Sequence, residues 1–223
     1  MRRAIVSRFC EGSVSILQIQ NISAGFAGAA PLLADLSIRV AGGELRLVQG
    51  PSGCGKSTLL GIISGTAATA LHWTGQVILN GVDIGSRPAE ERRVGLMFQD
   101  ALLFPHMTVG DNLAFGLASR HRGDRQARVN AALEVAGIAG FGDRDPATLS
   151  GGQAARVALM RTLLADPEAL LMDEAFTALD PDRRRAFGSF VRDQIRDRGI
   201  PALLVSHDAG DAAFADGDPV LLG

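Results

Sequence analysis

The stretch from Gly50 to Thr58, which reads GPSGCGKST, constrains the fold of this chain more than any other. It fits the phosphate-binding loop pattern G-x-x-x-x-G-K-[ST] without a mismatch. Residues 44–49 (ELRLVQ) before it predict a strand, and the residues from Lys56 to about Gly65 predict a helix. Because a strand, a loop and a helix in this order are the context that the motif requires, we predict a working phosphate-binding loop.

Each fixed position of the loop has a physical reason. Glycines let the backbone approach phosphate oxygens, and the successive N–H groups form an anion-binding nest at the positive end of a helix. We expect Lys56 to reach the β- and γ-phosphates of a nucleotide and the Ser57 hydroxyl to hold Mg²⁺. The alternative is a glycine-rich turn that precedes a helix by chance. The predicted nucleotide-binding residues of the loop are Gly50, Pro51, Ser52, Gly53, Cys54, Gly55, Lys56, Ser57 and Thr58.

The composition limits the other possibilities. The 223 residues are 47% hydrophobic and 21% charged, which predicts one globular domain. The net charge of −2 shows no basic excess for nucleic acid, so phosphate binding must come from local geometry. Cys10 and Cys54 form no metal or disulfide pattern, which fits a reducing cytoplasm. The longest apolar run, 58–71, is too short to span a bilayer, and residues 1–13 are predicted to be a loose extension without a secretory signal.

Predicted strands alternate with predicted helices along the chain, which indicates an α/β fold with a largely parallel sheet. The predicted strands are 14–22, 36–40, 44–49, 76–79, 93–98, 169–173, 201–206 and 219–222, and residues 23–28 are predicted to be a loop. The predicted helices are 56–65, 108–119, 124–136, 154–164, 181–198 and 208–215, with Thr108 and Asp124 as the caps of the second and third. Residues 100–165 are predicted to form a helical subdomain. In such sheets ligands bind at the carboxyl ends of strands, where Gln99, Asp173 and His207 also lie.

The strand 169–173 is apolar but is followed by two adjacent carboxylates, Asp173 and Glu174. A metal ion gives such a pair a function. We expect Asp173 to bind Mg²⁺, directly or through water, and Glu174 to orient or deprotonate an attacking water. The alternative, a solvated strand end, is the weaker interpretation beside a phosphate loop.

A second anion site is predicted about a hundred residues after the first. Leu149–Gln153 (LSGGQ) precedes the helix 154–164, and Ser150 is suited to cap it. The two glycines expose N–H groups at the positive end of the helix.

These features together resemble the ATP-binding subunit of an ABC transporter, from about Val14 onward. The resemblance rests on the phosphate loop, the Q-loop residue Gln99, the signature Leu149–Gln153, Asp173 and Glu174, the D-loop 178–180 and the H-loop residue His207. It implies a P-loop NTPase core with a mostly parallel central sheet, an antiparallel β subdomain and an inserted α-helical subdomain at about 100–165, within one ABC ATPase domain, 14–223.

The resemblance also implies a homodimer and the roles of the residues. Two cassettes pair head to tail, and each ATP lies between the phosphate loop of one chain and the signature of the other. The expected catalytic residues are Glu174, His207, Gln99 and Lys56, and the expected metal ligands are Ser57, Gln99 and Asp173. Further nucleotide contacts are expected from Phe26, Ser150, Gly151, Gly152, Gln153 and Asp180. Phe26 would stack on adenine; the alternative is an aromatic that packs in a loop.

The sequence departs from the family pattern at several positions. Ala175 stands where the family usually has Pro, Thr177 replaces the common Ser, and Ala154 and Ala155 follow the signature where Gln or Lys is frequent. None of these changes removes a reacting group, so ATP hydrolysis remains the expectation.

The resemblance implies an ATPase that drives a separate integral membrane permease from the cytoplasmic face of the inner membrane. Residues 99–109, followed by Asn112 and Leu113, resemble uptake ATPases for thiamine, molybdate, iron and polyamines, which also use a solute-binding protein. One alternative is a soluble cassette ATPase on ribosomes or DNA, but the second cassette, the coiled-coil insertion and the basic patch typical of those proteins are missing. The others are an export or extraction subunit, and a module without turnover, which conflicts with Glu174 and His207.

Overall fold

A computed structural model of the protein describes residues 15–223; the predicted extension 1–13 lies outside this part. The strands are β1 (Ile16–Phe26), β2 (Leu33–Ala41), β3 (Leu45–Gln49), β4 (Leu71–Leu79), β5 (Val82–Asp83), β6 (Val94–Met97), β7 (Ala169–Asp173), β8 (Ala202–Ser206) and β9 (Val220–Leu221). The α-helices are α1 (Lys56–Ser64), α2 (Val109–Phe115), α3 (Arg125–Val135), α4 (Gly151–Leu164) and α5 (Pro181–Arg198), and the 3₁₀ helices are η1 (Ala89–Glu91), η2 (Ser119–Asp124), η3 (Pro146–Thr148) and η4 (Ala209–Phe214).

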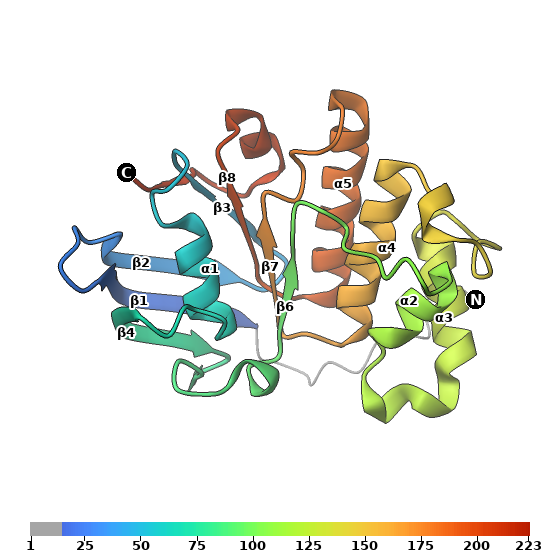
Figure 1. The fold of residues 1–223 in the computed structure, drawn as a ribbon, viewed down its shortest axis with the longest axis horizontal. Coiled ribbons are helices and arrows are strands. Elements are labelled where there is room, and N and C mark those ends of the chain that lie inside the picture. Colours follow the sequence, from blue (N-terminus) through green and yellow to red (C-terminus); the bar gives the residue numbers. More distant parts are fainter. Residues whose placement is uncertain (1–14) are drawn as a thin grey trace.

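A five-stranded parallel sheet of order β6-β7-β8-β3-β9 forms the centre of the molecule (Figure 1). Its strands are apolar on both faces because helices and a second sheet cover them. In β7, Leu170 and Met172 join the core on one side while Ala169 and Leu171 join the core on the other. This alternation follows from the two-residue period of a strand, and it gives the domain two hydrophobic cores that share one sheet.

The second sheet is antiparallel, with strand order β2-β1-β4-β5. Helix α1 lies between the two sheets (Figure 1) and packs its apolar side chains with theirs in one core. The fold class predicted from the sequence is confirmed: an α/β P-loop NTPase with a parallel sheet, an antiparallel sheet and helices.

Strands β1 and β4 extend further than the local sequence pattern predicts. Residues 23–26 were expected in a loop, but they continue β1 as far as Phe26, which pairs with Leu71 of β4. For the same reason β4 begins at Leu71 rather than at residue 76. Each strand supplies the hydrogen bonds of the other, so their pairing overrides the weak local preference of the polar residues.

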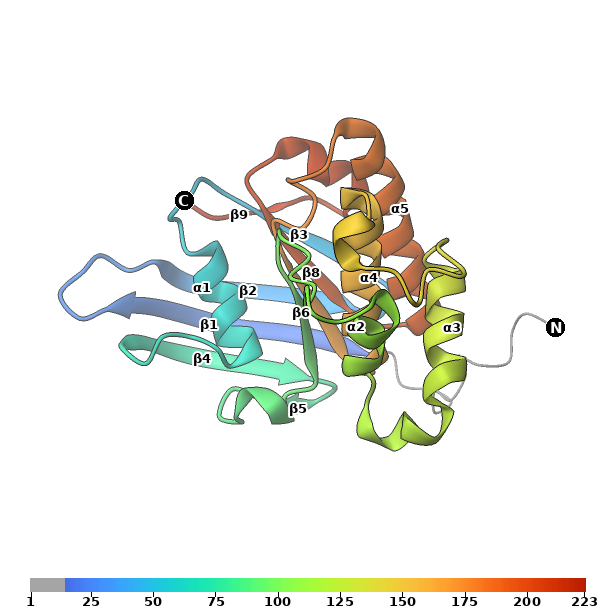
Figure 2. The same cartoon turned by 45° about the vertical axis from the view of Figure 1, so that its right-hand side comes forward.

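Helices α4 and α5 lie on the far face of the parallel sheet, and α2 and α3 pack on the outer side of α4 (Figure 2). Helix α2 ends at Phe115, four residues before the predicted end. The following residue, Gly116, touches the backbone of α4: a Cβ there would lie 2.1 Å from the carbonyl oxygen of Arg161. The assignment of residues 100–165 to an inserted subdomain stays a prediction.

Helix starts follow the predicted caps with one exception. Thr108 Oγ1 accepts from the backbone N–H of Asp111, and Ser150 and Gln153 form a reciprocal capping box at α4. Asp124 precedes α3 without a side-chain capping bond, so that predicted cap is wrong. The predicted helix 208–215 is the 3₁₀ helix η4.

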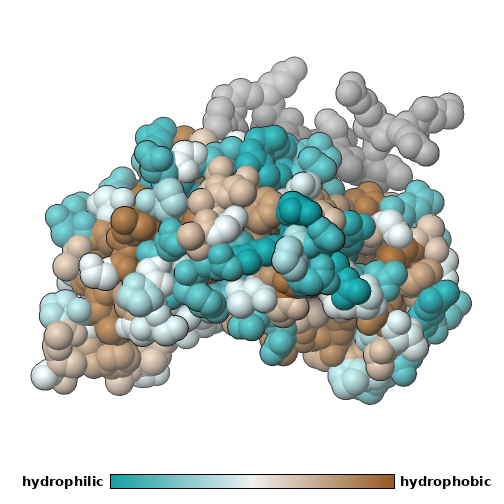
Figure 3. All heavy atoms as spheres, turned by 90° about the horizontal axis from the view of Figure 1, so that it is seen from above, coloured by the Kyte–Doolittle hydropathy of each residue, from teal (hydrophilic) through white to brown (hydrophobic). Residues whose placement is uncertain are grey.

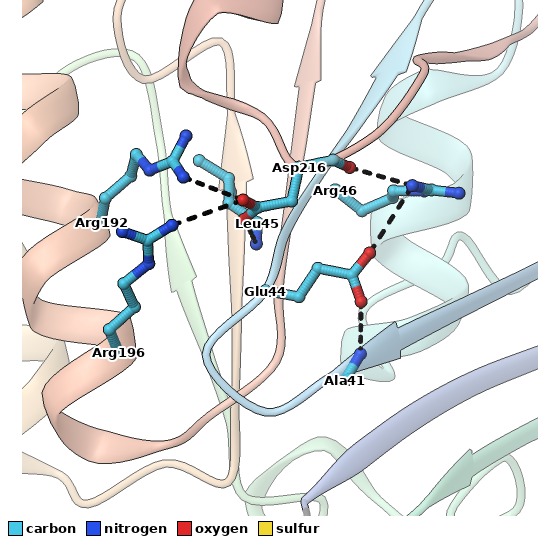
Figure 4. Close-up of polar contacts among 7 residues, drawn as sticks. All are labelled: Ala41, Glu44, Leu45, Arg46, Arg192, Arg196 and Asp216. Carbon is cyan, nitrogen blue, oxygen red and sulfur yellow. Dashed lines mark hydrogen bonds and ion pairs between the residues drawn. The ribbon is translucent and has the colours of Figure 1, made fainter.

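Asp216 ties the start of β3 to α5 (Figure 4). Its carboxylate accepts from Leu45 N at 3.0 Å and from Arg192 at 2.8 Å, and its carbonyl accepts from Arg46 at 2.9 Å. The strand that leads into the phosphate loop is therefore anchored at its base by charge-assisted hydrogen bonds. Within residues 15–223, no helix has both the length and the apolar character needed to cross a membrane.

Candidate active site

The register of the parallel sheet brings the predicted site residues to one edge. Gln49 pairs with Ser206, and Asp173 pairs with Val205, so the residues that follow these strand ends emerge next to one another. Seen from above this edge, the surface carries a band of hydrophilic residues between apolar areas (Figure 3). This is the carboxyl edge of the sheet, where parallel α/β folds bind ligands.

The phosphate loop is tightly constrained. A Cβ at Gly50 would lie 2.4 Å from the carbonyl oxygen of Leu222, and Gly55 has φ 100°, a conformation that other residues rarely adopt. Lys56 is only 6% exposed, and its ammonium group donates to the carbonyls of Gly50 and Pro51 at 2.8 Å each. The loop thus curls around the ammonium group. Lys56 is also the only lysine among the 22 basic residues of the chain.

Asp173 lies at the end of β7 beside the loop. Burial is the main cause that raises the pKa of Asp173 above its ordinary value, and the nearby Glu174 raises it further. A hydrogen bond from Ser57 and the charge of Lys56 act in the opposite direction. The structure therefore places a carboxylate, a hydroxyl and a cation within mutual reach, and the carboxylate is held in surroundings that favour its neutralisation.

Glu174 adopts the left-handed conformation, with φ 48°, which is uncommon for a residue other than glycine. Its N–H donates to Val205 on the neighbouring strand, and its carboxylate Oε1 lies 3.0 Å from Nδ1 of His207. The turn aims the two side chains at one another from the ends of adjacent strands. Strained backbone of this kind is often found at functional sites.

Two adjoining clefts open at this edge. One, of about 300 Å³, is lined by Phe26, Ser57, Thr58, Asp173 and apolar residues of α1 and its surroundings. The other, of about 430 Å³, contains Gln99, Asp173 and Glu174. Sequence reasoning missed Phe98, which lines both clefts with 45% of its surface exposed. The signal available in the sequence was an aromatic residue directly before Gln99, at the end of a predicted strand.

The signature lies apart from these clefts. No residue of Leu149–Gln153 is among the described residues that line either one. Ser150 N–H donates to the Gln153 side chain at 2.9 Å, and Ser150 Oγ accepts from Gln153 N–H at 3.4 Å. The start of α4 instead faces the D-loop and the first turn of α5: the Cβ positions of Gly151 and Gly152 approach Leu179 and Arg183. Asp180 caps α5 by accepting from the N–H of Arg183.

The donor set beside the phosphate loop fits Mg²⁺. Ser57 and Asp173 offer a hydroxyl and a carboxylate that line both clefts together, and Gln99 offers an amide oxygen in the second cleft. Mg²⁺ prefers oxygen ligands and is commonly held by one or two carboxylates together with substrate phosphates.

Comparisons with known proteins agree with this geometry. The sequence profile described as ABC transporter matches residues 33–177, more than half of the chain. An uncharacterised ABC transporter ATP-binding protein, YnjD of Escherichia coli, is 45% identical over 81% of this chain and 83% of its own length.

Two import proteins are also similar. The Fe(3+) ions import ATP-binding protein FbpC of Rhizobium etli is 40% identical over 91% of this chain, and the sulfate/thiosulfate import ATP-binding protein CysA 1 of Chromobacterium violaceum is 42% identical over 88%. The chain spans 57% and 55% of the length of these two relatives.

Proposed function

The chain belongs to the ABC transporter family, and from this premise we propose that two copies bind and hydrolyse ATP between them to drive solute uptake through a separate membrane subunit. The observation that carries this proposal is the separation of two anion-binding regions in one chain. The phosphate loop lies beside the proposed catalytic carboxylates, whereas the start of α4 lines neither cleft and leaves Ser150 exposed. A second copy, placed head to tail, supplies the missing half of each site.

In this proposal the first cleft takes the nucleotide. Phe26, 42% exposed at the end of β1, stacks on the adenine ring, and the N–H groups of the loop hold the phosphates. Lys56 exchanges its two carbonyl partners for phosphate oxygens. Ser150 and Gly152 of the partner chain close over the γ-phosphate, and the D-loop residue Asp180 lies beside them.

In this proposal ATP is hydrolysed in the second cleft, which Glu174 lines. Glu174 accepts a proton from the attacking water, and His207, 3.0 Å from that carboxylate, orients it and reaches the γ-phosphate. Gln99, which lines the same cleft, contacts the water as well. Ser57 and Asp173 hold Mg²⁺, which when bound neutralises charge that develops on the phosphates.

The import relatives support the direction of transport. Relatives named for import of Fe(3+), sulfate or thiosulfate, and spermidine or putrescine are 39–42% identical to this chain. We therefore propose that this protein sits peripherally on the cytoplasmic face of the inner membrane, bound to integral permease subunits that receive solute from a solute-binding protein. Nucleic acid is not a partner in this proposal, in keeping with the net charge of −2.

The dependence of ATP hydrolysis on protein concentration tests the proposal. If the site is shared between two copies, the rate with saturating ATP and Mg²⁺ should rise with the square of protein concentration while the protein is mostly monomeric. A rate that stays proportional to concentration throughout, from a protein that sedimentation shows to be monomeric, would contradict the shared site. Affinity capture from solubilised membranes then separates the functions, because a polytopic membrane protein supports transport and ribosomes or DNA contradict it.

A further inference from the structure

One face of helix α5 contacts the segment 208–216, which follows His207. Residues 184, 188, 192 and 196 recur every four positions and therefore share that face. A Cβ at Gly188 would lie 2.5 Å from the ring of Phe214, so the aromatic packs directly on the helix backbone. Further along, Arg192 donates to the carbonyl of Phe214 at 2.8 Å and to Asp216 (Figure 4).

Arg184 binds the beginning of this segment, where its guanidinium group contacts the carboxylates of Asp208 and Asp211. It donates from Nη1 to Asp208 at 2.5 Å and from Nε to Asp211 at 2.8 Å, and its Nη2 forms an ion pair with the same Asp211 oxygen at 2.6 Å. The Asp211 side chain is fully buried, whereas that of Asp208 keeps 40% of its surface exposed. A planar guanidinium group suits such a double contact because its donors form a fixed fork.

Asp208 is held from three directions. Its second carboxylate oxygen accepts from Gly210 N–H at 2.7 Å, and its own N–H donates to the buried Ser206 hydroxyl at 3.0 Å. The bond from Arg184 is the main cause that lowers the pKa of Asp208 below its ordinary value, so the pair remains charged near neutral pH. The residue next to His207 is thus fixed in place on the helix.

We propose that Arg184 is a positioning residue for His207: through Asp208 and Asp211 it locks the H-loop onto the first turn of α5. That helix begins at the D-loop residue Asp180, so the D-loop and His207 are parts of one rigid unit. Contact of the D-loop with a partner chain would then be transmitted to the histidine that faces Glu174. The inference rests on the proposed function, since it concerns the geometry of the hydrolysis site.

Asp208→Asn tests the inference with little expected effect on the fold. It removes the charged partner of Arg184 but leaves the buried Asp211 paired, so the fold should persist with a nearly unchanged melting temperature. We expect kcat for ATP to fall about tenfold while KM changes less than about twofold, since nucleotide binding does not involve this pair. The matched control is Arg185→Gln on the same helix turn, whose exposed pair with Asp182 has no contact with the H-loop and whose loss should leave kcat unchanged.

A double variant separates positioning from general damage. If Asp208 acts only through His207, then adding Asp208→Asn to His207→Ala should reduce kcat further by less than about twofold, because the two effects are not independent. A repeated tenfold loss in the His207→Ala background would overturn the inference, as would an unchanged kcat in Asp208→Asn alone.

A measurement without turnover keeps this inference distinct from the proposed function. The chain has four histidines, and the ring signals of His207 in an isotope-labelled NMR spectrum are identified by their loss in His207→Ala. These signals should shift in Asp208→Asn and stay in place in Arg185→Gln. Unshifted signals in Asp208→Asn would overturn the inference even if the wild-type protein hydrolyses ATP, whereas a wild-type protein without ATPase activity would overturn the proposed function.

Discussion

The two anion-binding regions of this protein are built in opposite ways. The phosphate loop follows a buried strand of the central sheet and packs against distant parts of the chain, since a Cβ at Gly50 would meet the carbonyl of Leu222 and one at Gly55 would meet Leu33. The signature at the start of α4 is made locally, by a capping box between Ser150 and Gln153 on an exposed helix end. One region is organised by tertiary packing and the other by four consecutive residues.

This difference indicates how a composite site can be divided between two chains. The phosphate loop has Lys56, the proposed metal ligands and the proposed catalytic residues beside it, so we expect it to hold a nucleotide within a single chain. The signature has backbone N–H groups and a hydroxyl but lines neither cleft. We expect changes at the first region to affect binding or chemistry directly, and changes at the second to act only when two copies meet.

The largest expected effect comes from Glu174→Gln, which keeps the shape of the side chain but removes the base. Hydrolysis should fall by about 10²–10⁴-fold, the range typical of a general base. Because binding is intact, the variant should accumulate as an ATP-bound dimer in light scattering. A monomer in saturating ATP and Mg²⁺ would contradict the shared site, and Asp182→Asn on the exposed surface of α5 serves as the control.

Lys56→Ala should weaken ATP binding by about 100-fold, equivalent to about 2.7 kcal/mol, because it removes the cation at the centre of the loop. Calorimetric titration of the monomer measures this loss. Ser150→Ala is the matched variant of the other region and should leave monomer affinity within about twofold. Equal affinity losses in both variants would argue against the division between the two regions. Since Lys56 is the only lysine in the chain, ATP should protect one side-chain amine from an amine-reactive reagent, and this protection checks independently that Lys56 contacts the nucleotide.

The smallest effect concerns stability and pH at Asp173. Its pKa is raised in the folded state, mainly by burial, so the folded protein is penalised at any pH above that pKa and the penalty disappears as pH falls below the unfolded value. Without Mg²⁺, Asp173→Asn should therefore raise the melting temperature at pH 7, by about 2–4 °C for each kcal/mol of penalty removed.

That gain in melting temperature should shrink as the pH is lowered. A constant gain, or a matching gain in the exposed control Asp182→Asn, would contradict the assigned cause. Together the three predictions rank the effects at the first region as chemistry, binding and stability, while the second region should respond only in the dimer.

Much of this fold follows from local patterns. The apolar strand 169–173 and the helix 181–198 agree with the structure residue for residue, and Ser150 caps α4 as predicted, although this helix begins at Gly151 rather than at residue 154. These elements are determined by short-range rules of hydrophobic period and helix capping. The order of the motifs likewise predicted the family and the fold class. The roles of the individual site residues stay predictions.

Tertiary structure decided what local patterns could not. Residues 23–26 are strand because β4 offers hydrogen-bond partners, and the close approach of Gly116 to the backbone of α4 is likewise a contact between distant segments. The contact between Glu174 and His207, 33 residues apart, exists only because β7 and β8 are neighbours in the sheet. The ion pairs of Arg184 with Asp208 and Asp211 had no signal in the sequence. Ion pairs between distant segments depend on packing geometry, which composition and spacing do not encode.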